Sequence, residues 1–289
     1  MTRTRLVAAV TAFLLLMTGA VEASGMDAME RGDHAASRRA VGHQGSQALP
    51  GPIGQAVAAY EEALAAQPDN LEVRVKLLSA LYFQCEFTLS EAPTKHAVFE
   101  RALEIASDGM EQLERGLAYA DASEENRSRL VRYLGDEPAA AGIYFWSAVY
   151  WGLWSRHAGT FEAAKKGVAN RIRDYSEVVI ALDASYENAG GHRVLGRLHT
   201  EAPRIPLITG WIDRDVAISE LEKAVESAPK DLRAHLFLAD ALLKHDSTRH
   251  DEAIERLNWV VRQSPDPELL VEETQVLEEA NHLLAGQRP

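Results

Sequence analysis

The sequence predicts an all-α protein in which repeated helical hairpins pack into one compact solenoid. Three observations lead to this prediction. From Ile53 onward, apolar residues recur at helical spacing nearly to the C-terminus. Segments with the alternating pattern of strands are scarce. One pattern of small residues, large apolar residues and a proline returns in three separate segments, which indicates internal repeats.

The first segment of the chain has the three parts of a secretory signal. Arg3 and Arg5 form a short basic start, LVAAVTAFLLLM is an apolar run, and small residues follow in TGAVEAS. The apolar run rises only about 18 Å as a helix, so it is too short to span a bilayer easily. We expect residues 1–23 to be a cleaved signal peptide, with cleavage after Ala20 or Ala23, and an uncleaved anchor is the alternative. This segment has no cysteine for lipid attachment, so we expect an exported, periplasmic and soluble mature chain.

Composition narrows the classes of function. The 289-residue chain is 46% hydrophobic, enough for a sizeable core, and its formal net charge is −13. An acidic chain repels nucleic acid and anionic lipid at long range, so no nucleic-acid partner is expected. The single cysteine, Cys85, cannot close an intrachain disulfide. Its apolar helical setting predicts a buried, inert thiol.

Residues 24–50 are rich in Gly, Ser, Ala, His and Arg and have no sustained apolar period. They predict a flexible lead-in, of which part could form a marginal helix. Residues 51–289 are expected to form a single helical-repeat domain.

The repeats match the second helix of a tetratricopeptide hairpin. In that helix, small residues let two helices approach closely, and a proline ends the helix. Two of the matching segments lie 36 residues apart, and LRAHLFLADALLKH between them predicts a first helix. The three segments are Ala56, Tyr60, Ala63 and Pro68; Ala217, Leu221, Ala224 and Pro229; and Ala253, Leu257, Val260 and Pro265.

Weaker copies of the pattern fill the middle of the chain, so we expect one continuous array. The tail, PELLVEETQVLEEANHLLAG, is amphipathic and predicts a capping helix. The weaker copies are Gly109, Leu113, Gly116 and Asp121; Ile172, Ser176, Val179 and Ala184; and the first-helix residues Leu195, Gly196 and His199.

The chain carries no recognisable motif for catalysis, phosphate binding or metal binding. There is no phosphate loop, dinucleotide fingerprint, Gly-x-Ser-x-Gly or zinc helix motif. GGHRVLG is better explained as the entry of a helix. The polar stretch KHDSTRHDEA groups two histidines with two aspartates, but such residues in an inter-helix loop are normally just solvated. We therefore predict no cofactor, no metal site and no enzymatic activity.

Two segments are the candidate contact sites. GIYFWSAVYWGLWSRH places aromatic side chains over more of a helix than one packing face needs, so it predicts a ligand-lined cavity or aromatic contact surface. A wholly buried helix is the alternative, and Gly152 would permit close helix approach in either case. In HRVLGRLHTEAPRIP, two arginines share a face, before Pro203 and Pro206 force an extended turn. These arginines could grip a partner carboxylate or pair with acidic neighbours. The candidate binding residues are Tyr144, Trp146, Tyr150, Trp151, Trp154, Arg193, Arg197 and His199.

The central part of the chain resembles the T-component of tripartite TRAP transport systems, a periplasmic tetratricopeptide-type family. The resemblance lies in YFWSAVYWGLWS, VVIALDASYENAGGHRVLGRLH and DRDVAISELEKAVESAP, and covers roughly residues 50–265. It implies an all-α fold, association with the transporter's substrate-binding subunit, a trimer with an internal hydrophobic channel, and a role in uptake of small apolar or organic-acid ligands. Family members are often lipoproteins, and this chain lacks the lipobox cysteine. A generic tetratricopeptide scaffold for protein–protein assembly in the cell envelope is the alternative.

Overall fold

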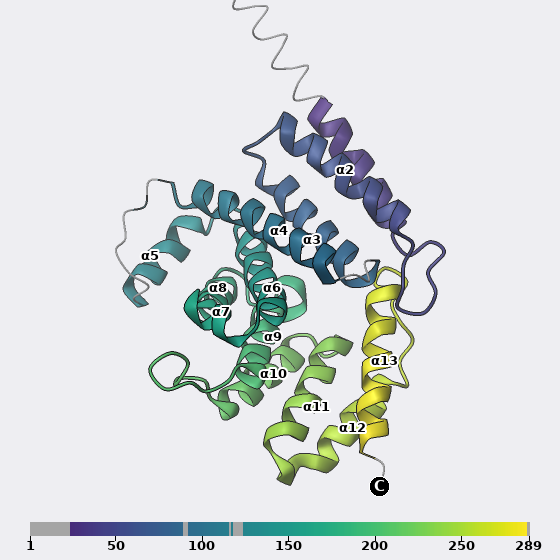
Figure 1. The fold of residues 1–289 in the computed structure, drawn as a ribbon, viewed down its shortest axis with the longest axis vertical. Coiled ribbons are helices and arrows are strands. Elements are labelled where there is room, and N and C mark those ends of the chain that lie inside the picture. The colour runs from purple at the N-terminus through teal and green to yellow at the C-terminus, as the bar shows by residue number, and fades with distance from the viewer. Residues whose placement is uncertain (1–23, 89–91, 116, 118–123, 288–289) are drawn as a thin grey trace, which may run out of the picture.

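The computed structural model describes residues 24–88, 92–115, 117 and 124–287, and these residues are mostly helical (Figure 1). In these ranges the sole β-type pairing is an isolated bridge between Gln44 and Gln47, so the predicted all-α class is confirmed. No described helix has an apolar stretch long enough to cross a membrane. The predicted signal peptide lies outside the described residues, as do Gly116 and Asp121 of one weak repeat.

The helices follow one another with short connections. The first covers residues 24–37. The others are α2 (Pro50–Ala66), α3 (Leu71–Phe87), α4 (Ala92–Leu113), α5 (Glu124–Leu134), α6 (Ala140–Ala158), α7 (Thr160–Lys165), α8 (Val168–Leu182), α9 (Tyr186–Glu201), α10 (Arg214–Ser227), α11 (Leu232–His245), α12 (His250–Val260) and α13 (Leu270–Gly286), with a short 3₁₀ turn at Ser247–Arg249.

Each predicted repeat segment forms the packing face of a helix. The small and large residues of the pattern in α2, α10 and α12 are all buried, and Tyr60, at 3% exposed, is the most accessible. The prolines follow the ends of these helices, as their missing N–H group requires. The hairpin-repeat prediction is therefore confirmed.

The hairpin of α9 and α10 shows why the pattern contains small residues. A Cβ atom added to Gly196 on α9 would lie 2.6 Å from Cγ of Leu221 and 3.1 Å from the carbonyl oxygen of Ala217 on α10. Those separations are shorter than van der Waals contact allows. Glycine is therefore needed here because the two helix backbones approach closely.

The segment predicted as a flexible lead-in with a marginal helix is built into the fold: the helix forms, and the prediction of flexibility is wrong. Residues 24–37 form a helix against α2 and α3, with Ala28 fully buried. Asp33 on this helix accepts a 2.7 Å hydrogen bond from the hydroxyl of Tyr60 and a 2.8 Å hydrogen bond from Nζ of Lys76. The buried residues of this helix are alanines and glycines, so its apolar period predicted no more than a marginal helix. The helical body begins well before residue 51.

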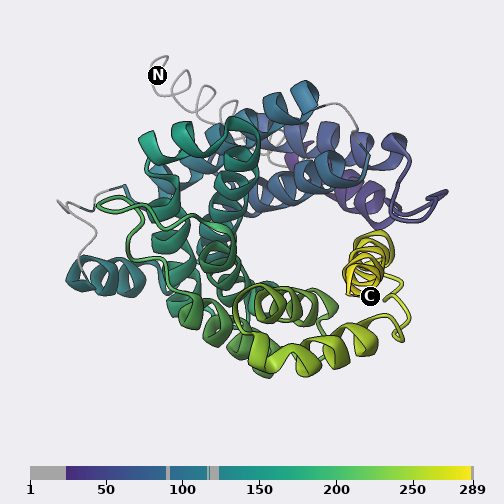
Figure 2. The same cartoon turned by 60° about the horizontal axis from the view of Figure 1, so that its bottom comes forward.

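The two ends of the solenoid meet, so the helices surround a central opening (Figure 2). The Arg39 guanidinium forms a 2.9 Å ion pair with Glu272 of α13 and donates a hydrogen bond to the carbonyl of Glu268. The Ser46 hydroxyl donates a 2.5 Å hydrogen bond to Glu278. The predicted capping helix, α13, therefore also joins the C-terminal end of the array to its N-terminal end.

Cys85 lies in the core, fully buried on α3. Burial raises the pKa of its thiol to about 12. The thiolate is the reactive form of cysteine, so this side chain is inert, as its apolar setting predicted.

Candidate functional site: a central cavity

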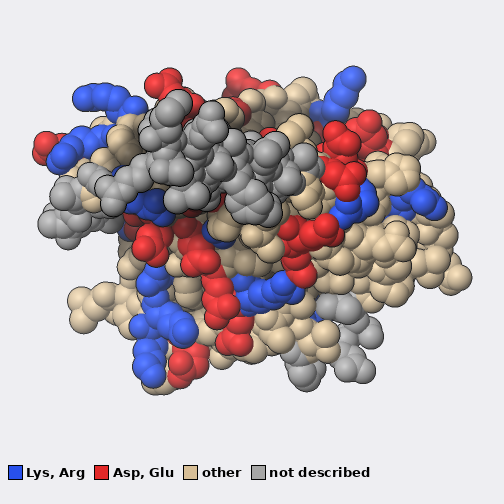
Figure 3. Space-filling model, turned by 90° about the horizontal axis from the view of Figure 1, so that it is seen from above, with Lys and Arg blue, Asp and Glu red and all other residues tan. Residues whose placement is uncertain are grey.

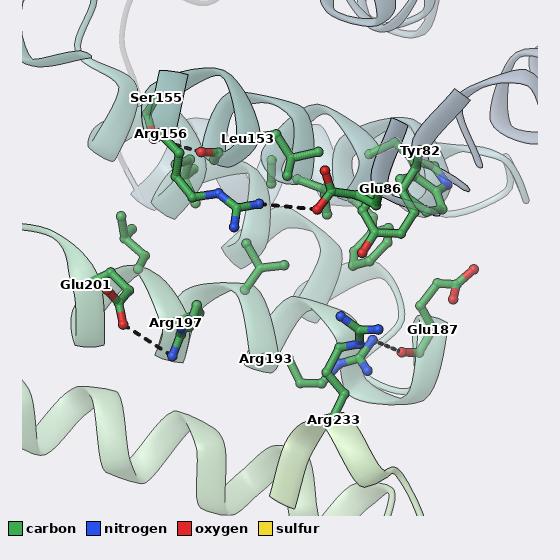
Figure 4. A pocket seen from close by; sticks show the side chains of 18 of the residues that line it. Tyr82, Glu86, Leu153, Ser155, Arg156, Glu187, Arg193, Arg197, Glu201 and Arg233 are labelled. Atoms are coloured by element: carbon green, nitrogen blue, oxygen red, sulfur yellow. Dashed lines mark hydrogen bonds and ion pairs between the residues drawn. The ribbon is translucent and has the colours of Figure 1, made fainter. Parts of the chain in front are cut away.

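A cavity of about 1200 Å³ occupies the centre of the ring. Its wall takes residues from the helix of residues 24–37 and from α2, α3, α6, α7, α8, α9, α11 and α13. Figure 4 shows part of this wall. Because both ends of the chain contribute, the cavity exists only when the ring is closed. Its volume is somewhat above the range of about 300–1,000 Å³ that is usual for sites that hold small ligands.

One wall of the cavity is apolar and comes mainly from α6. Phe145, Trp146, Val149 and Leu153 recur at helical spacing and share the face that lines it. The ring of Tyr82 from α3 packs 5.3 Å from that of Trp146, centroid to centroid. This surface suits the apolar body of a ligand or of a partner side chain.

Gly152 is part of the same wall. A Cβ atom added to it would have no neighbour within 4 Å. The expectation that Gly152 permits close helix approach is therefore wrong, since the residue faces open cavity space.

The predicted tyrosines of α6 lie in the core. Tyr144 is 1% exposed and donates a hydrogen bond to Glu114. Tyr150 is fully buried and donates a 2.7 Å hydrogen bond to the carbonyl of Leu78. Burial raises the pKa of Tyr150 well above its ordinary value. Both side chains bind α6 to its neighbours and do not reach the cavity.

The side chains of the three tryptophans of α6 lie in three different environments. Trp146 lines the cavity. Trp154 is buried, with Nζ of Lys166 5.0 Å from its ring centroid. Trp151 lies beside a separate pocket of about 550 Å³, with the guanidinium of Arg171 5.1 Å from its ring. The structure therefore does not gather the predicted aromatic residues into one site.

The wall opposite α6 is charged, and the two predicted arginines belong to it. Arg193 lines the cavity and is ion-paired with Asp231 at the start of α11. Arg197 also lines it and is paired with Asp240 and with Glu201, the latter at 3.2 Å. Pairing with acidic neighbours, one of the two expected arrangements, therefore occupies both guanidinium groups.

His199 supports the backbone beyond the end of α9. Its Nδ1 lies 3.0 Å from the backbone nitrogen of Asp213 and 3.1 Å from the carbonyl oxygen of the same residue. Burial lowers the pKa of His199 below its usual 6.5. The residue is 5% exposed and does not line the cavity.

The loop after α9 holds an exposed leucine in a fixed position. The Thr209 hydroxyl donates a 2.6 Å hydrogen bond to the carbonyl of Pro203 and accepts a 2.9 Å hydrogen bond from the backbone N–H of Ile205. Leu207, within this bonded turn, is 104% exposed and has a φ of 67°. The prolines predicted a turn here, but no pattern indicated that Leu207 would lie exposed at its tip.

A left-handed turn opens α9 beside the cavity. Glu187, Asn188 and Ala189 have φ values of 50°, 56° and 60°. Glu187 and Asn188 line the cavity, and burial raises the pKa of the Glu187 carboxyl. The sequence suggested that the following glycines served helix entry. Gly190 instead lies against the ring of Phe145, where an added Cβ would come within 2.5 Å.

The polar stretch after α11 has ordinary structural contacts. His245 Nε2 lies 3.1 Å from the carbonyl of Thr200, and Asp246 accepts a hydrogen bond from the backbone N–H of Thr248. Within the part of the chain that the structure describes, no three His, Cys, Asp or Glu side chains are placed to hold a metal ion.

Comparison with known proteins adds little to this geometry. No protein-family model matches the chain, and no curated protein matches it. Among solved structures, the chain is similar to the crystal structure of MamA protein, with 17% sequence identity and a TM-score of 0.42. That match covers 87% of this chain and 93% of the other. A likeness of this degree carries no information about function.

Proposed function

We propose that this chain is a non-enzymatic binding and assembly module that holds a small ligand or a partner segment in its central cavity. The observation that carries the proposal is the cavity itself, with an aromatic wall from α6 and a charged wall from α9 and α11. Concave sites with an apolar surface and a few polar groups are typical of ligand binding. On the face shown in Figure 3, acidic and basic side chains lie interleaved, which suits specific contacts better than broad electrostatic attraction.

We further propose that the chain is exported and associates with the substrate-binding subunit of a TRAP-type transporter. The signal-like segment and the resemblance of the central helices support this proposal. The Leu207 turn is the surface we assign to the partner, because it presents a fully exposed apolar side chain on a backbone that hydrogen bonds already hold, so binding would order little additional backbone.

The experiment is a pull-down from periplasmic extract with the tagged mature chain, comparing wild type with Leu207→Gly. A left-handed φ favours glycine, so the substitution should leave stability unchanged or raise it. We expect wild type to retain a solute-binding protein and Leu207→Gly to lose it. Met26→Ala, at a residue 58% exposed on the N-terminal helix, is the matched control and should retain it.

Recovery of unrelated envelope proteins alone would reject association with a TRAP-type transporter and support the alternative of a generic envelope scaffold. Retention by Leu207→Gly at wild-type level would show that the partner binds elsewhere. The resemblance also implies a trimer, which sedimentation of the mature chain tests.

A further inference from the structure

The two ends of the ring belong to two different hydrophobic cores. The first core runs from the helix of residues 24–37 to Ile212. The second takes its buried side chains from α10, α11, α12 and α13. α13 packs along α11 and α12, and its buried residues Val276 and Ala280 belong to the second core. Figure 2 shows α13 beside the N-terminal helices, where the two cores meet a second time and close the ring.

The closing contact is mainly polar. It contains one ion pair and two hydrogen bonds, and among the residues of α13 only Val271 belongs to the first core. Polar contacts of this kind add modest net stability, because water can bind the same groups when the contact opens. We name this contact the clasp, and it consists of Arg39 and Ser46 on one side and of Glu268, Val271, Glu272 and Glu278 on the other.

The other junction between the cores holds more tightly. Gly196 on α9 lies so close to α10 that an added Cβ atom would come within 2.6 Å of a side chain of that helix. The Arg214 guanidinium on α10 donates hydrogen bonds to carbonyls at the end of α9, among them that of Thr200 at 3.0 Å. Nζ of Lys244 on α11 lies 2.6 Å from the Glu201 carboxylate on α9. The chain also runs through this junction, so we expect the ring to open at the clasp.

The clasp is part of the cavity wall. Arg39 and Glu272 line the cavity as well as closing the ring. Separating them would therefore remove a section of the wall and widen the entry to the space inside. Local opening is easiest where few buried apolar contacts are lost, and here the loss is confined mainly to Val271.

We propose that the clasp is the gate of the central cavity, and that the ring opens there, with both cores intact, to admit what the cavity binds. This inference rests on the proposed binding function and adds the route by which the occupant enters. When the clasp opens, the guanidinium of Arg39 and the carboxylate of Glu272 regain water together, so no buried charge is left without a partner.

The first experiment measures the distance across the clasp by double electron–electron resonance between nitroxide labels at Ser37→Cys and Asn281→Cys. Both positions are exposed, and each native side chain bonds to a carbonyl of its own helix. Cys85 can stay, because it is buried and its raised pKa suppresses the reactive thiolate. We expect one main distance with Arg39 in place. Arg39→Glu, which sets two carboxylates against each other, should add a longer one.

Two controls accompany this measurement. Arg127→Glu reverses one charge of an ion pair with Glu177, which joins α5 to α8, and should leave the distance across the clasp unchanged. Labels at Glu255→Cys and Asn281→Cys lie on α12 and α13, within the second core, and should keep one distance in the Arg39→Glu background. A longer distance between these two labels would overturn the proposal, because it would mean that the second core unfolds.

The second experiment measures entry into the cavity through the reactivity of Gly152→Cys, whose side chain faces open cavity space. The probes are N-ethylmaleimide and a maleimide attached to a bulky polyethylene glycol chain. Arg39→Glu should speed the reaction with the bulky probe roughly fivefold to thirtyfold, and the reaction with the small probe less. Arg127→Glu should speed neither.

An unchanged distance across the clasp in Arg39→Glu would overturn the proposal, as would an unchanged rate with the bulky probe. Neither experiment requires a ligand or a partner protein. The proposed function is tested separately by retention of the partner through Leu207, which lies outside the clasp, so the two failures are distinguishable.

Discussion

Replacing Gly152 by alanine should stabilise the protein. Gly152 lies in the interior of α6, and a Cβ there meets nothing within 4 Å. Alanine is favoured over glycine by about 1 kcal/mol in a helix interior. No packing term opposes that preference here, so we expect a gain of about 0.5–1 kcal/mol. For a chain of this size, such a gain raises Tm by roughly 1–4 °C.

The assay is urea and thermal unfolding followed by far-UV circular dichroism, with Gly196→Ala as the matched control. Gly196 is also helical, but its Cβ would lie 2.6 Å from Leu221. Overpacking of this kind costs about 1–3 kcal/mol, more than the gain in helix propensity. The two glycine-to-alanine changes should therefore have opposite signs. A destabilised Gly152→Ala variant would refute the reasoning, because it would mean that α6 packs against protein where we place the cavity.

Two further variants test the ring and a buried histidine. Arg39→Gln removes the ion pair with Glu272, so the free energy of unfolding should fall by about 1–3 kcal/mol and amide hydrogen exchange in α13 should become faster. Unchanged exchange would show that other contacts hold the two ends of the chain together. His199 has a lowered pKa in the fold, so the unfolded chain takes up a proton below about pH 6.5 while the folded chain resists it, and stability falls as the pH drops through that value. His199→Asn can keep an acceptor for the Asp213 N–H, and it should lessen the loss of stability between about pH 7.5 and about pH 5.5. The loss that remains is due to His235, whose pKa is also lowered. An unchanged pH dependence would contradict the assignment of this loss to His199.

Much of the fold was predictable because its signals are local. The spacing of Ala217, Leu221 and Ala224 within one helix determines which face is buried, and the fold buries all three. The helix of residues 24–37 was expected only as a marginal one, for the opposite reason. Its position depends on Asp33 meeting Tyr60 and Lys76, contacts between residues far apart in the chain.

The site was less predictable, because a helical period says which residues share a face but not what that face meets. Trp146 and Tyr150 are four residues apart, yet the first lines the cavity and the second bonds to the backbone of α3. The arginines of α9 were visible as a pair, but their partners come from α11.

The left-handed turn at Glu187 helps to position Arg193. Three successive non-glycine residues in this conformation cost roughly 1–2 kcal/mol each, so local preference alone would not keep them there. The turn places the carbonyl of Glu187 where it accepts a 2.7 Å hydrogen bond from Arg193, which is also held by Asp231.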